Sequence, residues 1–481
     1  QLVLIPWPVM GHVQIIDFAK LILRRRHLHL LSGKSVSITV LLMKLPGYID
    51  KVSSSFVDKL SSAGESLRFI HLPPVAPTQE WSSRTRGFFT HSLVLSQRSN
   101  VADFLQQHKA STAAVVIDML CTSMIGVAED LNLPAYIFFT SPASFLGAML
   151  HFQALQDEGN TDVSELGNSE TNLLIPSFSI PVPPKALPQV VVEKTMWETR
   201  FLQYARDYRK AKGIIVNTLY ELEPFALNSF SNKSAYVGGV PPVFAVGPIL
   251  SQPPNLNLQD ESTTEMLQWL DRQPTKSVVF VCFGSQGSLE KHQIQELGKA
   301  LERSGYRFLW SLRRRPERSE QASFPIEYTR DEMEKVLADG FSARTAEMGR
   351  VRGWVPQQEV LSNAAVGGFV SHCGWNSVLE SLWYGVPMAT WPLHAEQHMN
   401  AFQLARELGL AEEISLECRE RVNARSEELI TAEEIVKGIE KMMNPNGEVR
   451  KAVEGMKEKC RMAVQGSSYV SLAKFFQTLM K

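Results

Sequence analysis

The sequence has little cysteine, and its cysteines follow no metal-binding or disulfide pattern. Among 481 residues there are only five, namely Cys121, Cys282, Cys373, Cys418 and Cys460. The number is odd, and no C-x-x-C pair occurs. A structural zinc site and a disulfide framework are therefore not expected, and the reducing cytoplasm is the predicted location.

Long apolar runs and an excess of one charge are also missing. No stretch approaches the roughly 18 uninterrupted apolar residues of a membrane span, and the formal net charge is −1. Proteins that bind nucleic acids or anionic membranes usually carry a basic excess. We therefore expect neither kind of partner. Two arginine runs, Arg24–Arg26 and Arg313–Arg315, are interpreted as solvated surface.

What the chain does contain is a repeated alternation of short apolar runs with helical patterns. This alternation is typical of parallel βαβ units. In the first half, the candidate strands are Leu2–Ile5, Val36–Leu42, Leu67–His71, Ala114–Ile117, Ala135–Phe138 and Gly213–Val216. In the second half, they are Val278–Phe283, Arg307–Trp310, Gly367–Val370 and Val386–Trp391.

The proline-rich stretch Val240–Leu256 separates the two halves and is interpreted as an interdomain linker. We predict an α/β protein with two doubly wound, Rossmann-like domains that face each other across a cleft. The predicted parts are an N-terminal domain at residues 1–239, a linker at 240–262, a second domain at 263–460, and a C-terminal helix at 461–481 that packs back on the first domain.

Two turns after strands in the second half are suited to phosphate. Small residues in Gly284-Ser285-Gln286-Gly287 let backbone N–H groups approach an anion. In His372-Cys373-Gly374-Trp375-Asn376-Ser377 a strand ends and a helix begins, with Asn376 or Ser377 suited to the N-cap. Free N–H donors, the helix dipole and the His372 imidazole would all meet a diphosphate there. For the first turn, an ordinary turn without a ligand is an equally good interpretation.

The 44-residue stretch from Trp354 to Gln397 closely resembles the signature box of plant family 1 glycosyltransferases, which take sugar from UDP-sugars. The resemblance implies a GT-B fold and assigns roles to residues at matching positions. Trp354 would stack on uracil, Val355 would contact the base through its backbone, and Gln357 and Glu380 would hold the ribose. Diphosphate contacts are implied for Ser285, His372, Gly374, Asn376 and Ser377, and sugar contacts for Thr140, Trp375, Glu396 and Gln397. Residue by residue, Trp354 and Trp375 also fit core aromatics, and Glu380 fits an exposed helix charge.

A candidate catalytic pair lies in the first half. Gly11-His12 follows the first strand, and the resemblance places a general base there, although many members have proline where this chain has Gln14 and Ile15. Asp118 ends the strand Ala114–Ile117 and is the candidate partner of His12. A neutral imidazole oriented by a carboxylate can accept a proton from a hydroxyl. A helix start for His12 and a helix cap for Asp118 are the plain structural alternatives.

The expected reaction is inverting transfer of glucose from UDP-glucose to a hydroxyl of a small lipophilic acceptor, giving a β-O-glucoside. The resemblance implies flavonoids, phenylpropanoids or terpenoids. Fixed donors and a helix N-terminus would replace the metal ion, since no Asp-x-Asp motif occurs. We therefore expect no cofactor and no metal, and a monomer whose partners are a UDP-sugar and the acceptor.

Three alternatives are open. A Rossmann oxidoreductase would need G-x-G-x-x-G after its first strand, and neither glycine turn has that spacing. A non-catalytic UDP-sugar sensor would keep Trp354–Gln397 but would need neither His12 nor Asp118. A transferase that uses another UDP-sugar would keep both.

Overall fold

The computed structural model describes residues 1–8, 12, 14–25, 36–44, 66–75, 86–159, 161–192, 196–250, 261–315, 325–416 and 429–479. The chain forms two compact units. Unit 1 comprises Gln1–Asp162, Met196–Ser251 and Ala463–Lys481, and unit 2 comprises Val163–Thr195 and Gln252–Met462. The predicted Gly11 lies outside the described residues, as do Cys418 and residues 251–260 of the predicted linker.

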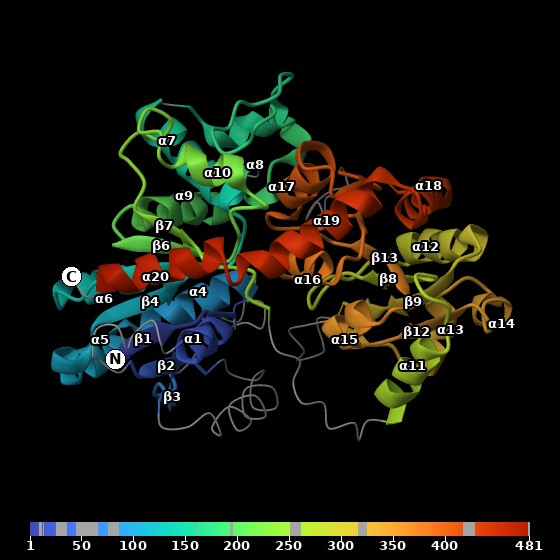
Figure 1. The fold of residues 1–481 in the computed structure, drawn as a ribbon, viewed down its shortest axis with the longest axis horizontal. Helices are drawn as coiled ribbons and strands as arrows, with labels where there is room; N and C mark the ends of the chain where they lie inside the picture. Colours follow the sequence, from blue (N-terminus) through green and yellow to red (C-terminus); the bar gives the residue numbers. More distant parts are fainter. Residues whose placement is uncertain are drawn as a thin grey trace. The chain divides into compact units, whose positions relative to one another are not determined.

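Unit 1 is built on a parallel sheet with the strand order β3-β2-β1-β4-β5-β6-β7 (Figure 1). Its strands are β1 (Leu2–Ile5), β2 (Ile38–Leu42), β3 (Leu67–His71), β4 (Ala114–Asp118), β5 (Ala135–Phe139), β6 (Gly213–Val216) and β7 (Val243–Ala245). All of the strands expected in the first half are present. β7 corrects the linker prediction, because three residues of the proline-flanked stretch pair with β6 instead of crossing between domains.

Helices cover both faces of this sheet, as the alternation of strand side chains requires. Phe138 stacks on Phe18 of one helix, while the next residue, Phe139, meets Tyr208 of another. The helices of unit 1 are α1 (Gln14–Arg24), α4 (Arg86–Ser96), α5 (Arg98–Gln107), α6 (Ser123–Asp130), α7 (Ala143–Glu158), α9 (Met196–Tyr208), α10 (Pro224–Ser229) and α20 (Ser467–Leu479), with a 3-10 turn η3 (Lys109–Ser111).

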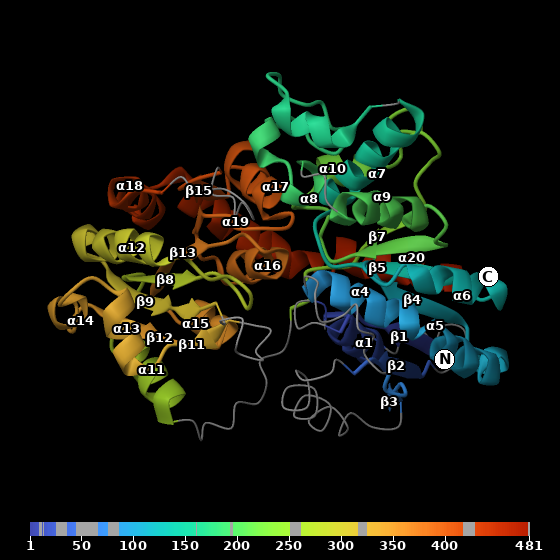
Figure 2. The same ribbon diagram turned by 180° about the vertical axis from the view of Figure 1, so that it is seen from behind.

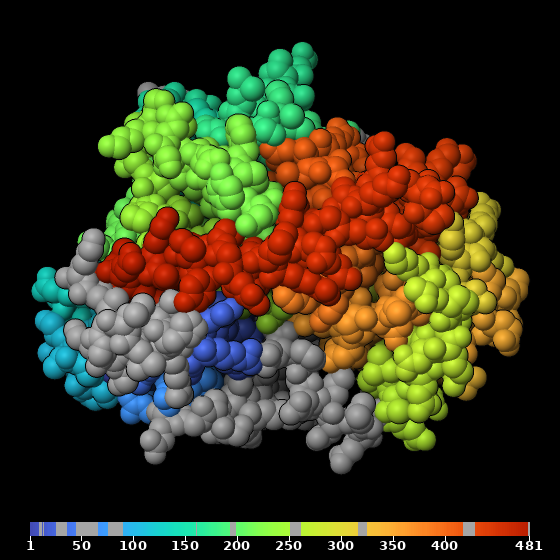
Figure 3. Space-filling view, in the orientation of Figure 1, coloured from blue at the N-terminus to red at the C-terminus, as the bar shows by residue number. Residues whose placement is uncertain are grey.

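The C-terminal helix α20 belongs to unit 1. Phe475 packs against Phe18 of α1, Tyr136 of β5 and Phe244 of β7. The outer side of α20 is exposed at Val470 and forms part of the molecular surface in Figure 3. Residues more than 450 positions apart in the sequence therefore share one core cluster.

Unit 2 has a second parallel sheet, with the order β12-β9-β8-β13-β14-β15 (Figure 2). Its strands are β8 (Val278–Cys282), β9 (Arg307–Ser311), β12 (Gly349–Arg352), β13 (Val366–Ser371), β14 (Met388–Thr390) and β15 (Ala411–Glu413). A separate antiparallel pair is formed by β10 (Arg313–Arg314) and β11 (Ile326–Glu327).

The helices of unit 2 pack on its sheet with an apolar core that includes Leu297, Trp310 and Ile439. They are α8 (Gln189–Val192), α11 (Glu261–Asp271), α12 (Lys291–Ser304), α13 (Arg330–Val336), α14 (Phe341–Arg344), α15 (Gln357–Ser362), α16 (Trp375–Tyr384), α17 (Gln397–Phe402), α18 (Ala432–Met443) and α19 (Glu448–Ala463), with 3-10 turns η4 (Val163–Asn168) and η5 (Pro184–Ala186) and a π-turn η6 (Gln403–Glu407). A capping box formed by Thr431 and Glu434 starts α18.

Residues 163–195 were assigned to the first domain from sequence, but in the structure they cluster with unit 2. Phe178 packs on Phe402 of α17, and Ser179 donates from its backbone and its hydroxyl to the Glu407 carboxylate. These contacts link positions that are 228 residues apart in sequence, which is a range that periodicity cannot detect.

Candidate active site

Both sheets reverse their strand order at a central pair of strands. In unit 1, the strands that follow β1 in sequence lie on one side of it, and the strands that follow β4 lie on the opposite side. In unit 2, β8 and β13 form the corresponding central pair. In open α/β sheets, ligands bind beyond the carboxyl ends of the strands at this switch point. Several predicted site residues lie at these strand ends, with His12 after β1, Asp118 at the end of β4, Ser285 after β8 and His372 after β13. The other predicted residues follow neighbouring strands or lie on α16.

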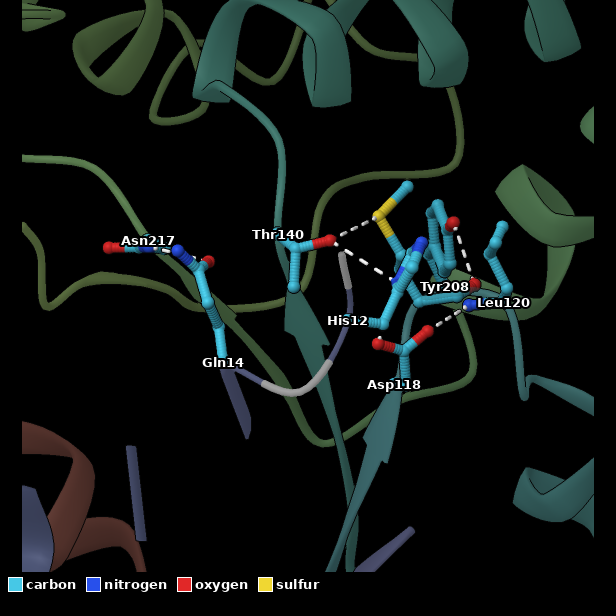
Figure 4. Close-up of polar contacts among 8 residues, drawn as sticks. His12, Gln14, Asp118, Leu120, Thr140, Tyr208 and Asn217 are labelled. Carbon is cyan, nitrogen blue, oxygen red and sulfur yellow. Dashed lines mark hydrogen bonds and ion pairs between the residues drawn. The ribbon is translucent and has the colours of Figure 1, made fainter. Parts of the chain in front are cut away.

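In unit 1 the structure brings His12 and Asp118 together. The His12 Nδ1 lies 2.9 Å from Oδ2 of Asp118, which is the last residue of β4 and is completely buried. The other carboxylate oxygen, Oδ1, accepts the backbone N–H of Leu120 at 2.9 Å. Figure 4 shows the two side chains facing each other beneath Thr140.

This geometry sets the tautomer of the imidazole. Because a carboxylate only accepts hydrogen bonds, Nδ1 of His12 carries the proton and Nε2 keeps its lone pair. The His12 side chain is 20% exposed, whereas that of Asp118 has no exposed surface. The pair therefore offers a base to a ligand while its orienting carboxylate is kept away from water.

The surroundings of the pair are fixed by further hydrogen bonds. Thr140, at the end of β5, lies with Oγ1 3.5 Å from His12 Nδ1 and 3.4 Å from the Met119 sulfur. Tyr208 of α9 donates to the Met119 carbonyl at 2.9 Å. The loop that follows Asp118 is thus pinned from a helix nearly 90 residues further along the chain.

In unit 2 the turns after β8 and β13 meet around His372. An added Cβ on Gly284 or Gly374 would come within 2.5 Å or 2.6 Å of His372 Nε2, so only glycine leaves room for the imidazole at these positions. Burial, with smaller effects of His394 and Arg313, lowers the pKa of His372 to about 3. The side chain is therefore neutral near pH 7. Cys373, between His372 and Gly374, has a φ of +62°, a conformation that is rare for a residue with a side chain.

The N-cap of the helix after this turn lies two or three residues earlier than predicted. It is Gly374, and Trp375 is the first residue of the helix. Asn376 and Ser377 therefore lie in the first turn, so the prediction that one of them is the N-cap was wrong. Because glycine has no side chain, Gly374 supplies no side-chain cap to this helix.

A cluster of polar side chains joins α15 to α16. The Gln357 amide donates to Glu380 Oε2 at 2.6 Å and to Ser377 Oγ at 2.9 Å, and Gln358 donates to Glu380 Oε1 at 3.0 Å. Glu380 is buried, which excludes the exposed helix charge that was the alternative for this residue. Burial raises the pKa of the Glu380 carboxyl to about 7, although both glutamine donors act to lower it.

The two predicted aromatic contacts differ in exposure. The Trp354 side chain is 52% exposed, whereas the Trp375 side chain is only 2% exposed. A core position is therefore excluded for Trp354 and found for Trp375. The Val355 side chain is buried as well. The Trp354 backbone N–H is held by Glu327 at 2.9 Å.

The remaining predicted residues lie on two loops of unit 2. Ser285 is exposed directly after β8. The Gln397 amide oxygen accepts the N–H groups of Leu393 and His394 at 2.9 Å and 3.0 Å, which leaves its amide nitrogen as a donor. Ala395, just before Glu396, has a φ of +53°. Two non-glycine residues with positive φ, Cys373 and Ala395, therefore lie next to predicted donor-site residues.

Several participants were missed from sequence. Arg313 was interpreted as solvated surface, but it donates to the Gly284 carbonyl from β10. Gln358 completes the Glu380 cluster, and Asn400 donates to the Cys373 carbonyl at 2.9 Å. Of these three residues, only Gln358 could have been found from the sequence, because it directly follows the predicted Gln357. Arg25 is likewise not plain surface, because it bonds to the Val464 carbonyl and lies over the Tyr469 ring.

Metal ligands and membrane helices were also sought. Across the described ranges, no group of three or more His, Cys, Asp or Glu side chains is placed to hold a metal ion. None of the helices that the structure describes has the length and apolar character needed to cross a membrane.

Comparison with known proteins identifies the family. The sequence profile of the UDP-glucoronosyl and UDP-glucosyl transferases matches residues 254–441. A UDP-glucose flavonoid 3-O-glucosyltransferase 6 of Fragaria ananassa is 43% identical, with 100% of this chain and 98% of that protein covered. The crystal structure of a transferase from Siraitia grosvenorii in complex with UDP is similar, with a TM-score of 0.84 and 42% identity over 100% of this chain and 99% of that chain. The structure of Medicago truncatula UGT71G1 complexed with UDP-glucose also has a TM-score of 0.84, with 35% identity over 100% of this chain and 98% of that chain. With its two Rossmann-like sheets of the GT-B type and its full-length similarity to these enzymes, the chain belongs to the UDP-glycosyltransferase family.

Proposed function

We propose that this enzyme transfers glucose from UDP-glucose to a hydroxyl group of a small lipophilic acceptor, with inversion at the anomeric carbon and without a metal ion. The observation that carries the proposal is the 2.9 Å bond from His12 Nδ1 to the buried Asp118. This bond leaves Nε2 as a base. A sensor that only binds UDP-sugars has no use for such a pair.

In the proposed reaction, the acceptor oxygen attacks the anomeric carbon as its proton passes to His12 Nε2. The bond from the anomeric carbon to the diphosphate breaks, and UDP leaves with the bonding electron pair. Attack from the side opposite UDP converts an α-linked donor into a β-glucoside. Asp118 stabilises the imidazolium that forms, which is its role in comparable triads.

The donor is assigned to unit 2. The exposed Trp354 ring is suited to stack on uracil, and the Glu380 carboxyl with Gln357 is suited to hold the ribose hydroxyls. The diphosphate would meet Ser285, His372 and the backbone at the start of α16, at Gly374, Asn376 and Ser377. Since His372 is neutral in the free protein, it would act there as a hydrogen-bond donor and not as a fixed charge.

UDP-glucose and a flavonoid-like acceptor are inferred from the relatives' names and from the apolar segments of the chain. One relative is named as a flavonoid 3-O-glucosyltransferase, and one neighbour holds UDP-glucose. Segments expected to line the acceptor site include Met119–Met124 and Ser144–Met149, which consist mostly of buried apolar residues. A flat or lipophilic hydroxylated acceptor matches such a lining better than a sugar does.

The test is UDP release from UDP-glucose in the presence of a metal chelator, against flavonols, simple phenols and triterpenoids, with His12→Ala run beside the wild type. The proposal expects release that requires both an acceptor and His12. Tight UDP binding without release from any acceptor would favour a sensor, and release only from another UDP-sugar would change the donor. Release that stops on adding the chelator would contradict metal independence.

A further inference from the structure

The helix that follows His12 begins with a buried amide. Gln14 is the first residue of α1, and its side chain is only 1% exposed. Its Oε1 accepts a hydrogen bond from Asn217 Nδ2 at 2.9 Å, and its Nε2 donates to the Ile249 carbonyl at 3.3 Å. Asn217 is completely buried and directly follows β6. The two amides are 203 residues apart in sequence.

The backbone at Ile249 determines how both amides are oriented. The Ile249 N–H donates to Asn217 Oδ1 at 2.7 Å, so that atom must be the oxygen. Asn217 Nδ2 then donates to the Ile249 carbonyl at 3.1 Å as well as to Gln14 Oε1. Each of these hydrogen bonds thus pairs a donor with an acceptor, and a network satisfied in this way has one arrangement.

The chain packs closely around Asn217. A Cβ on Gly247 would come within 2.5 Å of Asn217 Oδ1 and 2.8 Å of the Thr218 nitrogen. The Gly247 N–H also donates to the Thr218 carbonyl at 2.7 Å. Gln14 is therefore bonded to a buried and closely packed part of unit 1.

Gln14 follows His12 by two residues in the sequence, and the two side chains bond to different strand ends of unit 1. Figure 4 shows Gln14 and Asn217 pointing toward each other on one side and His12 meeting Asp118 on the other. His12 contacts Asp118 at the end of β4 and Thr140 after β5, and Gln14 contacts Asn217 after β6. Because β4, β5 and β6 are neighbours in the sheet, His12 and Gln14 together bond to the ends of three successive strands.

We propose that Gln14 and Asn217 are positioning residues that hold the start of α1, and thereby the His12 imidazole, in place against Asp118. This inference rests on the proposed role of His12 as the base. Proline at the start of a helix would fix φ without reaching a neighbouring strand. Gln14 instead reaches Asn217, after β6, through its side chain.

The test is the substitution Gln14→Met, assayed with UDP-glucose and the most active acceptor of the panel. Methionine preserves the shape, and Asn217 and Ile249 keep their bonds to each other, so the fold is expected to survive. Because a catalytic group displaced by about 1 Å can cost roughly 100-fold, we expect kcat to fall about 10- to 100-fold. The KM for UDP-glucose and the UDP affinity should change less than about twofold. The acid limb of the pH–rate profile should also move, since the contact with Asp118 is loosened.

The matched control is Gln97→Met. Gln97 is another fully buried glutamine of unit 1, bonded to the Pro73 carbonyl at 2.9 Å and to Asn100 at 2.8 Å. This variant loses the same kind of amide, and its kcat should stay near that of the wild type. If both variants lose kcat equally, the effect is general destabilisation and the proposal is overturned. Asn217→Asp keeps an acceptor for the Ile249 N–H but loses the donor to Gln14, and it should lower kcat in the same way.

A double-mutant cycle separates this proposal from the proposed function. If Gln14 acts through His12, Gln14→Met should have no further effect on kcat in a His12→Ala background. Independent losses that multiply would overturn the positioning role while leaving His12 as the base. Wild-type kcat in His12→Ala alone would refute the base itself, and the positioning role with it.

Discussion

The two sheets place their site residues at equivalent switch points, yet the two buried carboxylates there have different partners. Asp118 accepts one backbone N–H and the Nδ1–H of an imidazole that can become a cation. Glu380 accepts only from two neutral glutamine amides, and burial raises its pKa to about 7. The first arrangement is suited to stabilising a positive charge that forms during a reaction. In the second arrangement, hydroxyl groups of a bound ligand can replace the glutamine amides as hydrogen-bond donors to the carboxylate.

The neighbouring histidines show the same contrast. The half-buried His12 is paired with a carboxylate, whereas the buried His372 lies near His394 and Arg313, and its pKa is lowered to about 3. We propose that the switch point of unit 1 serves proton transfer and that the switch point of unit 2 serves donor recognition. Each prediction below tests one side of this proposed division, and the strongest effects are given first.

Asp118→Asn should have the largest effect on turnover. An amide can donate to His12 Nδ1, which would favour the wrong tautomer and place the proton on Nε2. We expect kcat to fall roughly 10²- to 10⁴-fold, the range seen for comparable triads. Steady-state kinetics with saturating UDP-glucose measures this loss. A fall in UDP affinity of similar size would show that Asp118 is structural.

Glu380→Ala should mainly affect donor binding. Hydrogen bonds to a charged group are worth about 1.5–3 kcal/mol, so UDP affinity should fall roughly 10- to 100-fold. Titration calorimetry with UDP gives the value. Glu359→Ala is the comparison variant, because Glu359 is a nearby, partly buried glutamate whose pKa is likewise raised by burial. Unchanged UDP affinity in Glu380→Ala would remove the proposed ribose contact.

Trp354→Ala should weaken UDP binding roughly 10-fold, since stacking of a base on an aromatic ring is worth about 1–3 kcal/mol. Trp354→Phe keeps a ring and should recover part of the affinity. The same calorimetric titration detects both changes. Equal affinity of Trp354→Ala and the wild type would exclude stacking, and the exposed ring would then need another explanation.

The pKa of Glu380 predicts the smallest effect, a pH dependence of UDP affinity. Below about pH 7 the carboxyl is protonated, and above it the carboxylate accepts from ribose hydroxyls more strongly. UDP affinity should therefore rise a few-fold between pH 6 and 8 relative to Glu380→Gln, which does not titrate. Stability should follow the opposite course, because a raised carboxyl pKa lowers the free energy of unfolding as pH rises from 4.5 through 7. Parallel pH curves for the two proteins would contradict the assignment.

The sequence predicted the features that depend on local pattern. Buried strands such as Val278–Cys282 are nearly continuous apolar runs. His12 and Asp118 lie near the ends of such runs, but the resemblance to the glycosyltransferase family, and not the local pattern alone, indicated a catalytic role for them. β7 was missed because its three residues are flanked by prolines, which usually indicate a linker. The start of α16 was misplaced because glycine caps a helix through its backbone and not through a side chain.

Contacts across long sequence separations were beyond the reach of the sequence. Nothing near Gln14 indicates that its amide meets Asn217, and nothing near Arg313 indicates that it bonds to the Gly284 carbonyl. The buried side chain of Trp375 was likewise undecided, because the apolar face of a helix and a ligand contact use the same residue types. Such features depend on which strand ends the fold brings together.

The most direct test of the division between the two sheets is to measure kcat and the UDP dissociation constant on the same preparations of His12→Ala and Glu380→Ala. We expect His12→Ala to lose kcat by roughly 10²- to 10⁴-fold while its UDP dissociation constant stays near that of the wild type. Glu380→Ala should instead weaken UDP binding and retain most of its turnover at saturating donor. If His12→Ala loses UDP affinity as strongly as turnover, His12 supports the structure of the site and the proposed base is wrong.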